Sequence, residues 1–436
     1  MRHVKLLGIA VVVGCGGAMA ACSDLTDIKN TGIVQPESEN NAVGAAAFYA
    51  GATQKFVAAT QNSIMFTGLF TDEWIDGTNG GVFGYLDARR AQTSVVQTGQ
   101  ELTDYSNALI AVRFATEALL KYAPKPGSRV AQMYSYSGYL ELFLAEQFCN
   151  GIPFGNIDFN GTVTHGAGIT TAETYARAIA HFDSAIAVSD SARVTNLALV
   201  GKGRALVGLG KFAEAAAAVA AVPTNFVYNL DINAAVAGNQ NTLYTFGTLN
   251  KRTGVSPGAN GINGINWVAA ADPRVRVQAN GKALDGIQDV FTYLPFNGLG
   301  APVPIATGIV ARLIQAEAAL QANNNDAATT GTGWLGILNT LRTTGITPAM
   351  TPLADPGSFS ARVDLLFRER AFWLYLTANR MPDMRRLVRQ YGRAENTVFP
   401  TGTYKDNLPY GTEVNFVAPT LEGPNPAYTG CIDRKA

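Results

Sequence analysis

The thiols are the most reactive side chains of this sequence, and Cys22 has the most distinctive surroundings. Small residues precede it in the string Met19-Ala20-Ala21-Cys22, and a basic start and an apolar run over residues 6–13 lie upstream. Such a run is too short to cross a bilayer, so it predicts a cleaved export signal over residues 1–21. In bacterial lipoproteins the thiol at this place receives a diacylglycerol. We therefore expect a lipidated Cys22 that anchors the chain to a membrane.

Two alternatives to this assignment remain open. The string Val12-Val13-Gly14-Cys15 is a second, upstream match to the same pattern, and Met19 stands where Leu is usual. The other alternative is an ordinary signal peptide followed by an incidental cysteine.

Past Cys22 the sequence has two further cysteines, Cys149 and Cys431. An even number of thiols in an exported chain favours a disulfide between them. Two unrelated thiols are the alternative.

Catalytic patterns are missing from the sequence. The histidines are His3, His165 and His181, and no His-Glu-x-x-His, Cys-x-x-Cys, EF-hand or Gly-x-Ser-x-Gly pattern occurs. The pair Asp72-Glu73 could suggest the acid and nucleophile of a glycosidase, but adjacent carboxylates rarely converge on one bond. The sequence therefore predicts no enzyme, no metal site and no cofactor.

One glycine pattern resembles a nucleotide-binding turn. Gly331-Thr-Gly333-Trp-Leu-Gly336 matches Gly-x-Gly-x-x-Gly, but it follows an Asn-rich linker instead of a strand. It predicts a flexible loop that enters a helix.

Binding chemistry is better represented, by aromatic rings in two segments rich in Gly and Asn. Sugar rings stack on aromatic faces, and covering half of one ring contributes about 2 kcal/mol. The candidate ligand contacts are Trp74 and Tyr85 in one segment and Trp267 and Tyr293 in the other. The two tryptophans rank first because polar side chains flank them. For each ring, packing within the loop is the alternative.

The composition excludes several classes of partner. Lys plus Arg and Asp plus Glu are equal at 33 each, and charged residues make up only 15% of the chain. This balance does not support nucleic acid or anionic lipid as the main partner. Apart from the start, no apolar run approaches the length of a membrane span.

Apolar residues recur at helical spacing in ten segments. The predicted helices are 41–60, 102–122, 128–148, 171–188, 194–209, 212–222, 308–322, 334–342, 359–377 and 380–391. Thr170 and Glu173 form a capping-box pattern at the start of the fourth. Three regions are predicted to be rich in loops: 67–99, 223–307 and 396–436.

The middle helices have the pattern of a tandem repeat. Small residues at Gly203 and Ala205 precede a Gly210-Lys211-Phe212 turn and an Ala-rich second helix. This is typical of a tetratricopeptide unit, although Ala-rich hairpins of other folds share it.

These landmarks fall in one order, and in that order the chain resembles the SusD/RagB family. The string Cys22-Ser-Asp-Leu-Thr-Asp27 follows the lipidation pattern, and a Thr-Gly-Ile-Val-Gln-Pro36 segment comes next. Four later strings are similar to family motifs: Leu-Ala-Glu-Gln-Phe-Cys-Asn-Gly-Ile-Pro153, Asp272-Pro273-Arg274, residues 309–319 with their Ala-Glu-Ala step, and Leu338-Asn-Thr-Leu-Arg342. The most characteristic block spans residues 367–387, where Glu369-Arg370 is followed by Arg380-Met-Pro-Asp383-Met-Arg385.

The resemblance implies a mainly α fold, a tetratricopeptide-like helical scaffold with long irregular loops. It implies one domain over residues 22–436, with helical parts at about 41–222 and 308–392. It further implies a lipoprotein of the outer membrane, facing the cell surface, that passes an oligosaccharide or peptide to a SusC-like TonB-dependent transporter. Departures at residues 371–375 and 377–379 leave the ligand class open between glycan and peptide.

The charged block around Arg380 has a plainer interpretation as scaffold. Two packed helices with ion pairs at their rim would explain it, each pair contributing at most about 1 kcal/mol. A lipid-anchored helical-repeat adaptor that binds only protein is the alternative function for the chain, and a surface hydrolase is a third.

Overall fold

The computed structural model describes residues 40–78, 81–90, 96–158, 162–323, 331–418, 425–428 and 430–435. The export signal, Cys15 and Cys22 lie outside these residues. Within them, no helix combines the length and the apolar character that crossing a bilayer requires.

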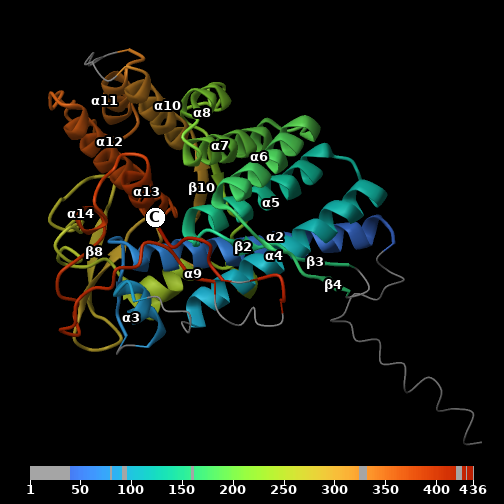
Figure 1. The fold of residues 1–436 in the computed structure, drawn as a ribbon, viewed down its shortest axis with the longest axis horizontal. Coiled ribbons are helices and arrows are strands. Elements are labelled where there is room, and N and C mark those ends of the chain that lie inside the picture. The colour runs from blue at the N-terminus through green and yellow to red at the C-terminus, as the bar shows by residue number, and fades with distance from the viewer. Residues whose placement is uncertain are drawn as a thin grey trace, which may run out of the picture.

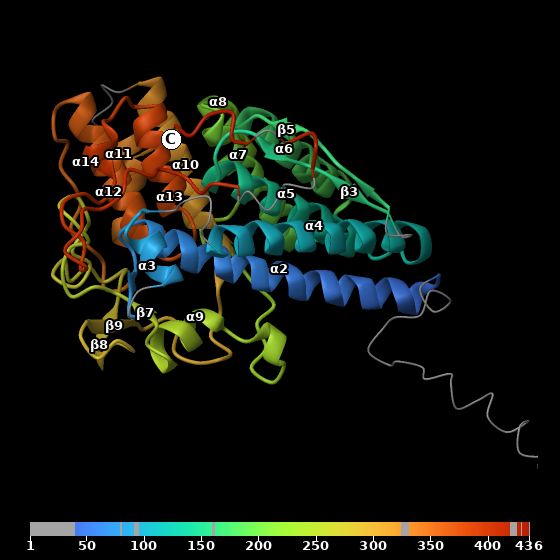
Figure 2. The same ribbon diagram turned by 60° about the horizontal axis from the view of Figure 1, so that its bottom comes forward.

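Antiparallel helix pairs form the larger part of the scaffold (Figure 1). Helix α2 packs on α4, α5 on α6, and α7 on α8, and Figure 2 shows α2 and α4 lying side by side with α5 above them. The bounds are α2 (Ala42–Phe70), α4 (Val96–Tyr122), α5 (Gly127–Gln147), α6 (Thr171–Val188), α7 (Ala192–Gly208) and α8 (Phe212–Ala218).

A second group of helices follows later in the chain and continues the stack. Helix α10 packs against both α8 and α11, and α12 contacts α10. The bounds are α10 (Gly308–Ala322), α11 (Trp334–Thr344), α12 (Phe359–Trp373), α13 (Arg380–Arg389) and α14 (Glu395–Val398). The mainly α, repeat-like architecture predicted from the sequence is therefore confirmed.

Glycines set the close packing of α5, α6 and α7. A Cβ atom added at Gly138 or Gly201 would lie 2.7 or 2.3 Å from atoms of the Phe182 ring. The ring of Phe182 on α6 therefore fits between α5 and α7 only because neither position carries a side chain.

The strands are short and pair two by two, all antiparallel. The pairs are β1 (Ile75–Asp76) with β7 (Thr253–Gly254), β2 (Ile152–Pro153) with β5 (Gly168–Ile169), β3 (Asn156–Ile157) with β4 (Val163–Thr164), β6 (Val227–Asn229) with β10 (Pro304–Thr307), and β8 (Val277–Lys282) with β9 (Asp289–Tyr293). Between them lie the short elements α3 (Val82–Asp87), η1 (Ala237–Asn239), α9 (Thr242–Tyr244) and η2 (Thr245–Leu249).

The observed helix ends match the predicted ones best where a side chain caps the first turn. The predicted ranges 171–188 and 308–322 match α6 and α10 residue for residue, and the Thr170–Glu173 capping box is present. The predicted helix 41–60 instead runs to Phe70, because its last turns are buried on nearly all sides and lack an amphipathic period. The loop predicted over 67–99 is correspondingly shorter. The predicted helix 359–377 ends at Trp373, before Leu376 and Ala378, whose φ angles are 52° and 56°.

The charged helix block is scaffold, but its ion pairs are not at a rim. Arg380 donates to both carboxylate oxygens of Asp72 at 2.7 and 2.8 Å, and both side chains are buried. Arg370 and Arg386 share Asp383 in the same buried layer. The prediction of exposed pairs is therefore wrong. A buried guanidinium without its partner would cost several kcal/mol, so each arginine needs its carboxylate.

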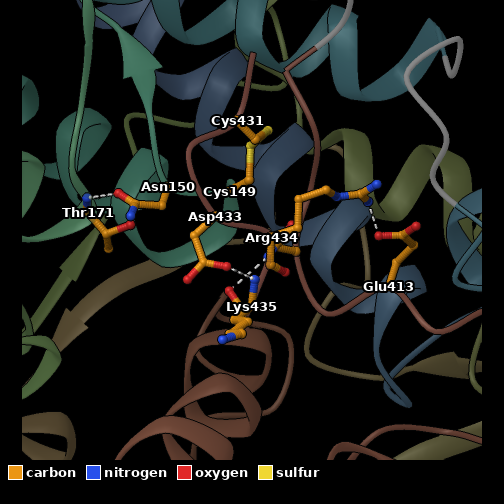
Figure 3. Close-up of a disulfide and its surroundings, with 9 residues drawn as sticks. Cys149, Asn150, Thr171, Glu413, Cys431, Asp433, Arg434 and Lys435 are labelled. Carbon is orange, nitrogen blue, oxygen red and sulfur yellow. Dashed lines mark hydrogen bonds and ion pairs between the residues drawn. A yellow bond between two sulfur atoms is a disulfide. The ribbon is translucent and has the colours of Figure 1, made fainter. Parts of the chain in front are cut away.

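The C-terminal tail is tied to the end of α5 by a disulfide between Cys149 and Cys431, as the sequence predicted (Figure 3). Their Cα atoms lie 5.9 Å apart. Backbone hydrogen bonds hold the same segments together, with Cys149 donating to Phe416 and Ile432 donating to Asn150.

We predict that the double change Cys149→Ser and Cys431→Ser lowers the free energy of unfolding. The cysteines are 282 positions apart, so loss of the cross-link restores chain entropy to the unfolded state, on the order of 5 kcal/mol as an upper limit. Thermal unfolding with and without reductant measures the effect. An unfolding midpoint that reductant leaves unchanged, or two titratable thiols in the unreduced, denatured protein, would contradict the prediction.

A second prediction concerns Glu73, which is buried next to the Asp72–Arg380 pair. Burial raises the pKa of Glu73 from 4.5 to about 8. The folded state thus keeps a proton that the unfolded chain loses, and stability falls as pH rises from about 4.5 to about 8, by at most about 1.4 kcal/mol per pH unit. The change Glu73→Gln should remove this contribution.

Denaturant unfolding from pH 5 to 8 tests this expectation, with Glu214→Gln as the matched control at an exposed site. Asp87, whose pKa burial raises to about 7, still titrates in both variants and leaves a residual slope. An equal slope for Glu73→Gln and wild type would show that Glu73 is ionised in the fold.

Candidate functional site

A long groove of about 900 Å³ lies between helices α4, α5 and α6 and the segment that carries β2 to β5. Figure 2 shows β3 and β5 beside α5 and α6, at the end of the molecule away from β8 and β9. Groove side chains from α4 include Leu102, Leu109, Arg113 and Leu120. Their spacing of four or seven places them on one helix face, which spans about 27 Å at 1.5 Å per residue. The groove is therefore long enough for an extended ligand.

The opposite wall is the β2–β5 segment. It contributes Phe154, Ile157, Val163 and His165. This wall folds tightly on itself, since a Cβ atom added at Gly166 would lie only 1.6 Å from the carbonyl oxygen of Phe154. The C-terminal tail reaches the same wall, where the Asn425 side-chain amide donates to the Gly166 carbonyl at 3.0 Å.

The most polar part of the groove surrounds Glu141 of α5. Its side chain is 1% exposed, and Arg177 and His181 of α6 cover it. Arg177 Nε and Nη2 lie 3.1 and 3.0 Å from Glu141 Oε1, and His181 Nδ1 lies 2.7 Å from Glu141 Oε2. One buried carboxylate thus fixes two side chains that face the groove.

Two aromatic rings flank this cluster. The Arg177 guanidinium lies 4.6 Å from the centroid of the Phe154 ring. The rings of Tyr134 and His181 are stacked, with centroids 6.4 Å apart and an angle of 27° between their planes. Rings next to fixed donors and acceptors can bind a ligand that has both apolar faces and hydroxyl groups.

The groove carboxylate is held in place by its neighbours. Both oxygens of Glu141 are occupied, one by Arg177 and the other by His181. Within the described residues no group of three or more His, Cys, Asp or Glu side chains could hold a metal ion.

The two tryptophans favoured by the sequence are core residues. Trp74 is 2% exposed and Trp267 is 0% exposed. The Trp267 indole donates to the backbone of Asp72, and its ring contacts Phe372 and Tyr375. Neither ring can stack on a ligand from solvent, so the structure contradicts the predicted contacts at these two positions.

Tyr293 and Tyr85 have different surroundings. Tyr293 is half-buried, packs on Phe296 and Tyr375, and shares with Trp74 a cavity of about 10 Å³, room for about one water. Tyr85 on α3 is 51% exposed. Neither lines the groove. Of the four predicted rings, Tyr85 alone presents most of a face to solvent, and its ligand contact stays a prediction.

The groove residues were not singled out by the sequence. Arg177 and His181 are four apart on a predicted helix, as are Ser137 and Glu141 on another. Such polar pairs on otherwise apolar helix faces were the available signal. The two helices that carry them meet only in the fold.

Solved structures show which fold this is. A SusD superfamily protein from Bacteroides fragilis is 12% identical, with 89% of this chain and 99% of that chain covered and a TM-score of 0.63. A SusD superfamily protein from Bacteroides vulgatus is 13% identical, with the same coverage and a TM-score of 0.61. A laminarin-binding SusD-like protein is 12% identical, with 90% and 99% covered and a TM-score of 0.57.

No protein-family model and no curated protein matches the sequence. At these identities the structural likeness establishes the fold, and the chain has the SusD fold over about nine-tenths of its length. The resemblance predicted from the sequence motifs is confirmed at this level.

Proposed function

We propose that this protein is a SusD/RagB-type binding protein that captures an oligomeric nutrient, an oligosaccharide first among the candidates, without turning it over. The observation that carries the proposal is the groove between α4, α5 and the β2–β5 segment, in a chain that has the SusD fold. Its length suits a chain of several units. Its rings, guanidinium and imidazole supply the contacts that sugars use.

The solved structures support the ligand class. One of them is named as laminarin-binding and another as a SusD-like carbohydrate-binding protein. Those names describe the other proteins. They make a carbohydrate the first ligand class to test on this chain, with a peptide as the second.

The burial of the carboxylates that a hydrolase would need also favours a binding role. Asp72 and Glu73, the one adjacent pair that suggested a glycosidase, are at most 1% exposed and lie beside Arg380. A substrate cannot reach them in this fold. The proposal is therefore a non-enzymatic protein.

The cellular setting follows from the lipidation pattern at Cys22 and the SusD fold together. The protein would be attached to the outer membrane through its acylated N-terminus and face the cell surface. There it would deliver its ligand to a SusC-like TonB-dependent transporter. The alternative, a lipid-anchored helical-repeat adaptor, would bind protein and no glycan, so a glycan array separates the two functions.

We predict that Tyr134→Ala weakens oligosaccharide binding by about ten- to thirtyfold. Loss of one stacking ring removes about 2 kcal/mol of contact. A glycan array identifies a ligand for the full chain, and calorimetry with that glycan measures the change. Tyr85→Ala is the control for the site predicted from the sequence. A loss of affinity with Tyr85→Ala and none with Tyr134→Ala would place the site on α3 and remove it from the groove.

We predict that Cys22→Ser releases the protein from membranes, because the acyl chains would be its attachment. Fractionation of cells that express each variant tests this, with Cys15→Ser as the matched control for the upstream pattern. Sedimentation of Cys22→Ser with outer membranes in high salt would contradict the prediction. Release by Cys15→Ser alone would assign the lipid to Cys15.

A further inference from the structure

The buried carboxylate of Glu141 determines what the two side chains above it can offer a ligand. His181 Nδ1 lies 2.7 Å from Glu141 Oε2, so this nitrogen carries the ring proton. In the neutral imidazole the other nitrogen, Nε2, is then a hydrogen-bond acceptor. The side chain of His181 is 32% exposed and lines the groove. The hydrogen bond to Glu141 therefore fixes the tautomer of His181, and Nε2 is the acceptor that this side chain offers to the groove.

Arg177 is the matching donor. Its Nε and Nη2 atoms are used by Glu141, and within the described residues Nη1 has no hydrogen-bond partner. The side chain is 48% exposed, and the Phe154 ring supports the guanidinium. Because Arg177 and His181 share one carboxylate, a donor and an acceptor lie next to each other at the groove surface.

The charges of the groove cancel in pairs. Glu141 balances Arg177, and Arg113 Nη1 pairs with Glu117 Oε1 at 2.9 Å. The remaining ionisable residues that line the groove are His165, His181 and Tyr134, a phenol that is neutral at pH 7. An acidic ligand would find each arginine already neutralised, and a basic ligand would find no free carboxylate.

We infer that the groove selects an uncharged, polyhydroxylated chain, with Arg177 donating to one hydroxyl and His181 Nε2 accepting from another. This inference rests on the proposed function and narrows its ligand to neutral oligosaccharides. Glu141 is a positioning residue, because it acts on the ligand through the other two. A hydroxyl group both donates and accepts, so neighbouring hydroxyls of a sugar match this pair.

The decisive variant is Glu141→Gln, which keeps the shape of the side chain and removes its charge. Arg177 then carries an unbalanced positive charge, and the fixed tautomer of His181 is lost. We expect affinity for neutral gluco-oligosaccharides to fall about tenfold and affinity for oligogalacturonates of the same length to rise. Both are measured by calorimetry on the full chain.

Two further variants keep the test sharp. Asp183→Asn makes the same change of charge on α6, at a side chain that is 51% exposed, pairs with Lys202 and does not line the groove. It should leave both affinities unchanged. Arg177→Met keeps an apolar stem on Phe154 and removes the donor, so it should weaken neutral ligands without strengthening acidic ones.

A spectroscopic measurement separates positioning from plain stability. The sequence contains three histidines, so nitrogen-15 spectra of histidine-labelled protein are simple, and His181→Gln identifies the signal. Wild type should show a protonated Nδ1 and a bare Nε2. Glu141→Gln should move this signature while Asp183→Asn leaves it in place.

The outcomes distinguish the inference from the function on which it rests. If wild type binds neutral glycans and Glu141→Gln shifts neither the preference nor the tautomer, the inference is wrong and the function stands. A wild-type protein that prefers oligogalacturonates would also contradict the inference and leave the proposed function standing. If a neutral peptide library binds in place of oligosaccharides, the inference is wrong and peptide, the second ligand class, takes over in the proposed function. If neither oligosaccharide nor peptide binds, the proposed function is wrong as well.

Discussion

The buried pair of Asp72 and Arg380 is the interaction on which the rest of the fold depends. Asp72 follows the last turn of α2 and accepts two hydrogen bonds from Arg380 at the start of α13. The same aspartate accepts from the backbone of Ile265 and, through its own carbonyl, from the Trp267 indole. Three distant parts of the chain thus meet at one carboxylate. In a medium of low polarity such a junction is stable only when each member is present.

The buried charges continue from this junction to the helix that carries the groove cluster. Arg386 joins α13 to Glu317 of α10 and to Asp383. Arg385 donates to the last carbonyl groups of α5, at Ala145 and Glu146, which need partners because a helix end leaves them free. Burial lowers the pKa of Arg385 to about 10, which still leaves it charged at neutral pH. The orientation of α5, and with it of Glu141, is therefore set by the core.

Local signals in the sequence predicted the helices well. The even number of cysteines favoured the disulfide, and the order of the motifs predicted the fold. Thr170 with Glu173 marks the start of α6 by a short-range hydrogen bond, so neighbouring residues contain the information. The burial of Trp267 could not be predicted in this way. Its partners Phe372 and Tyr375 are more than a hundred positions away, and the surrounding Asn and Gly residues are typical of an exposed loop. The groove could not be predicted for the same reason, since α4, α5, α6 and Asn425 meet only in the folded chain.

The distribution of charge distinguishes the core from the groove. In the core, several arginines gather around a few carboxylates, and their role is to fix helices whose small side chains bury little area each. In the groove, each arginine has a single acidic partner, and part of its surface remains open to solvent. Helix α5 belongs to both regions, because Glu146 pairs with Arg204 in the core and Glu141 lies five residues earlier in the groove wall. A change that shifts the end of α5 should therefore move the groove cluster, although Glu146 and Arg204 themselves do not line the groove.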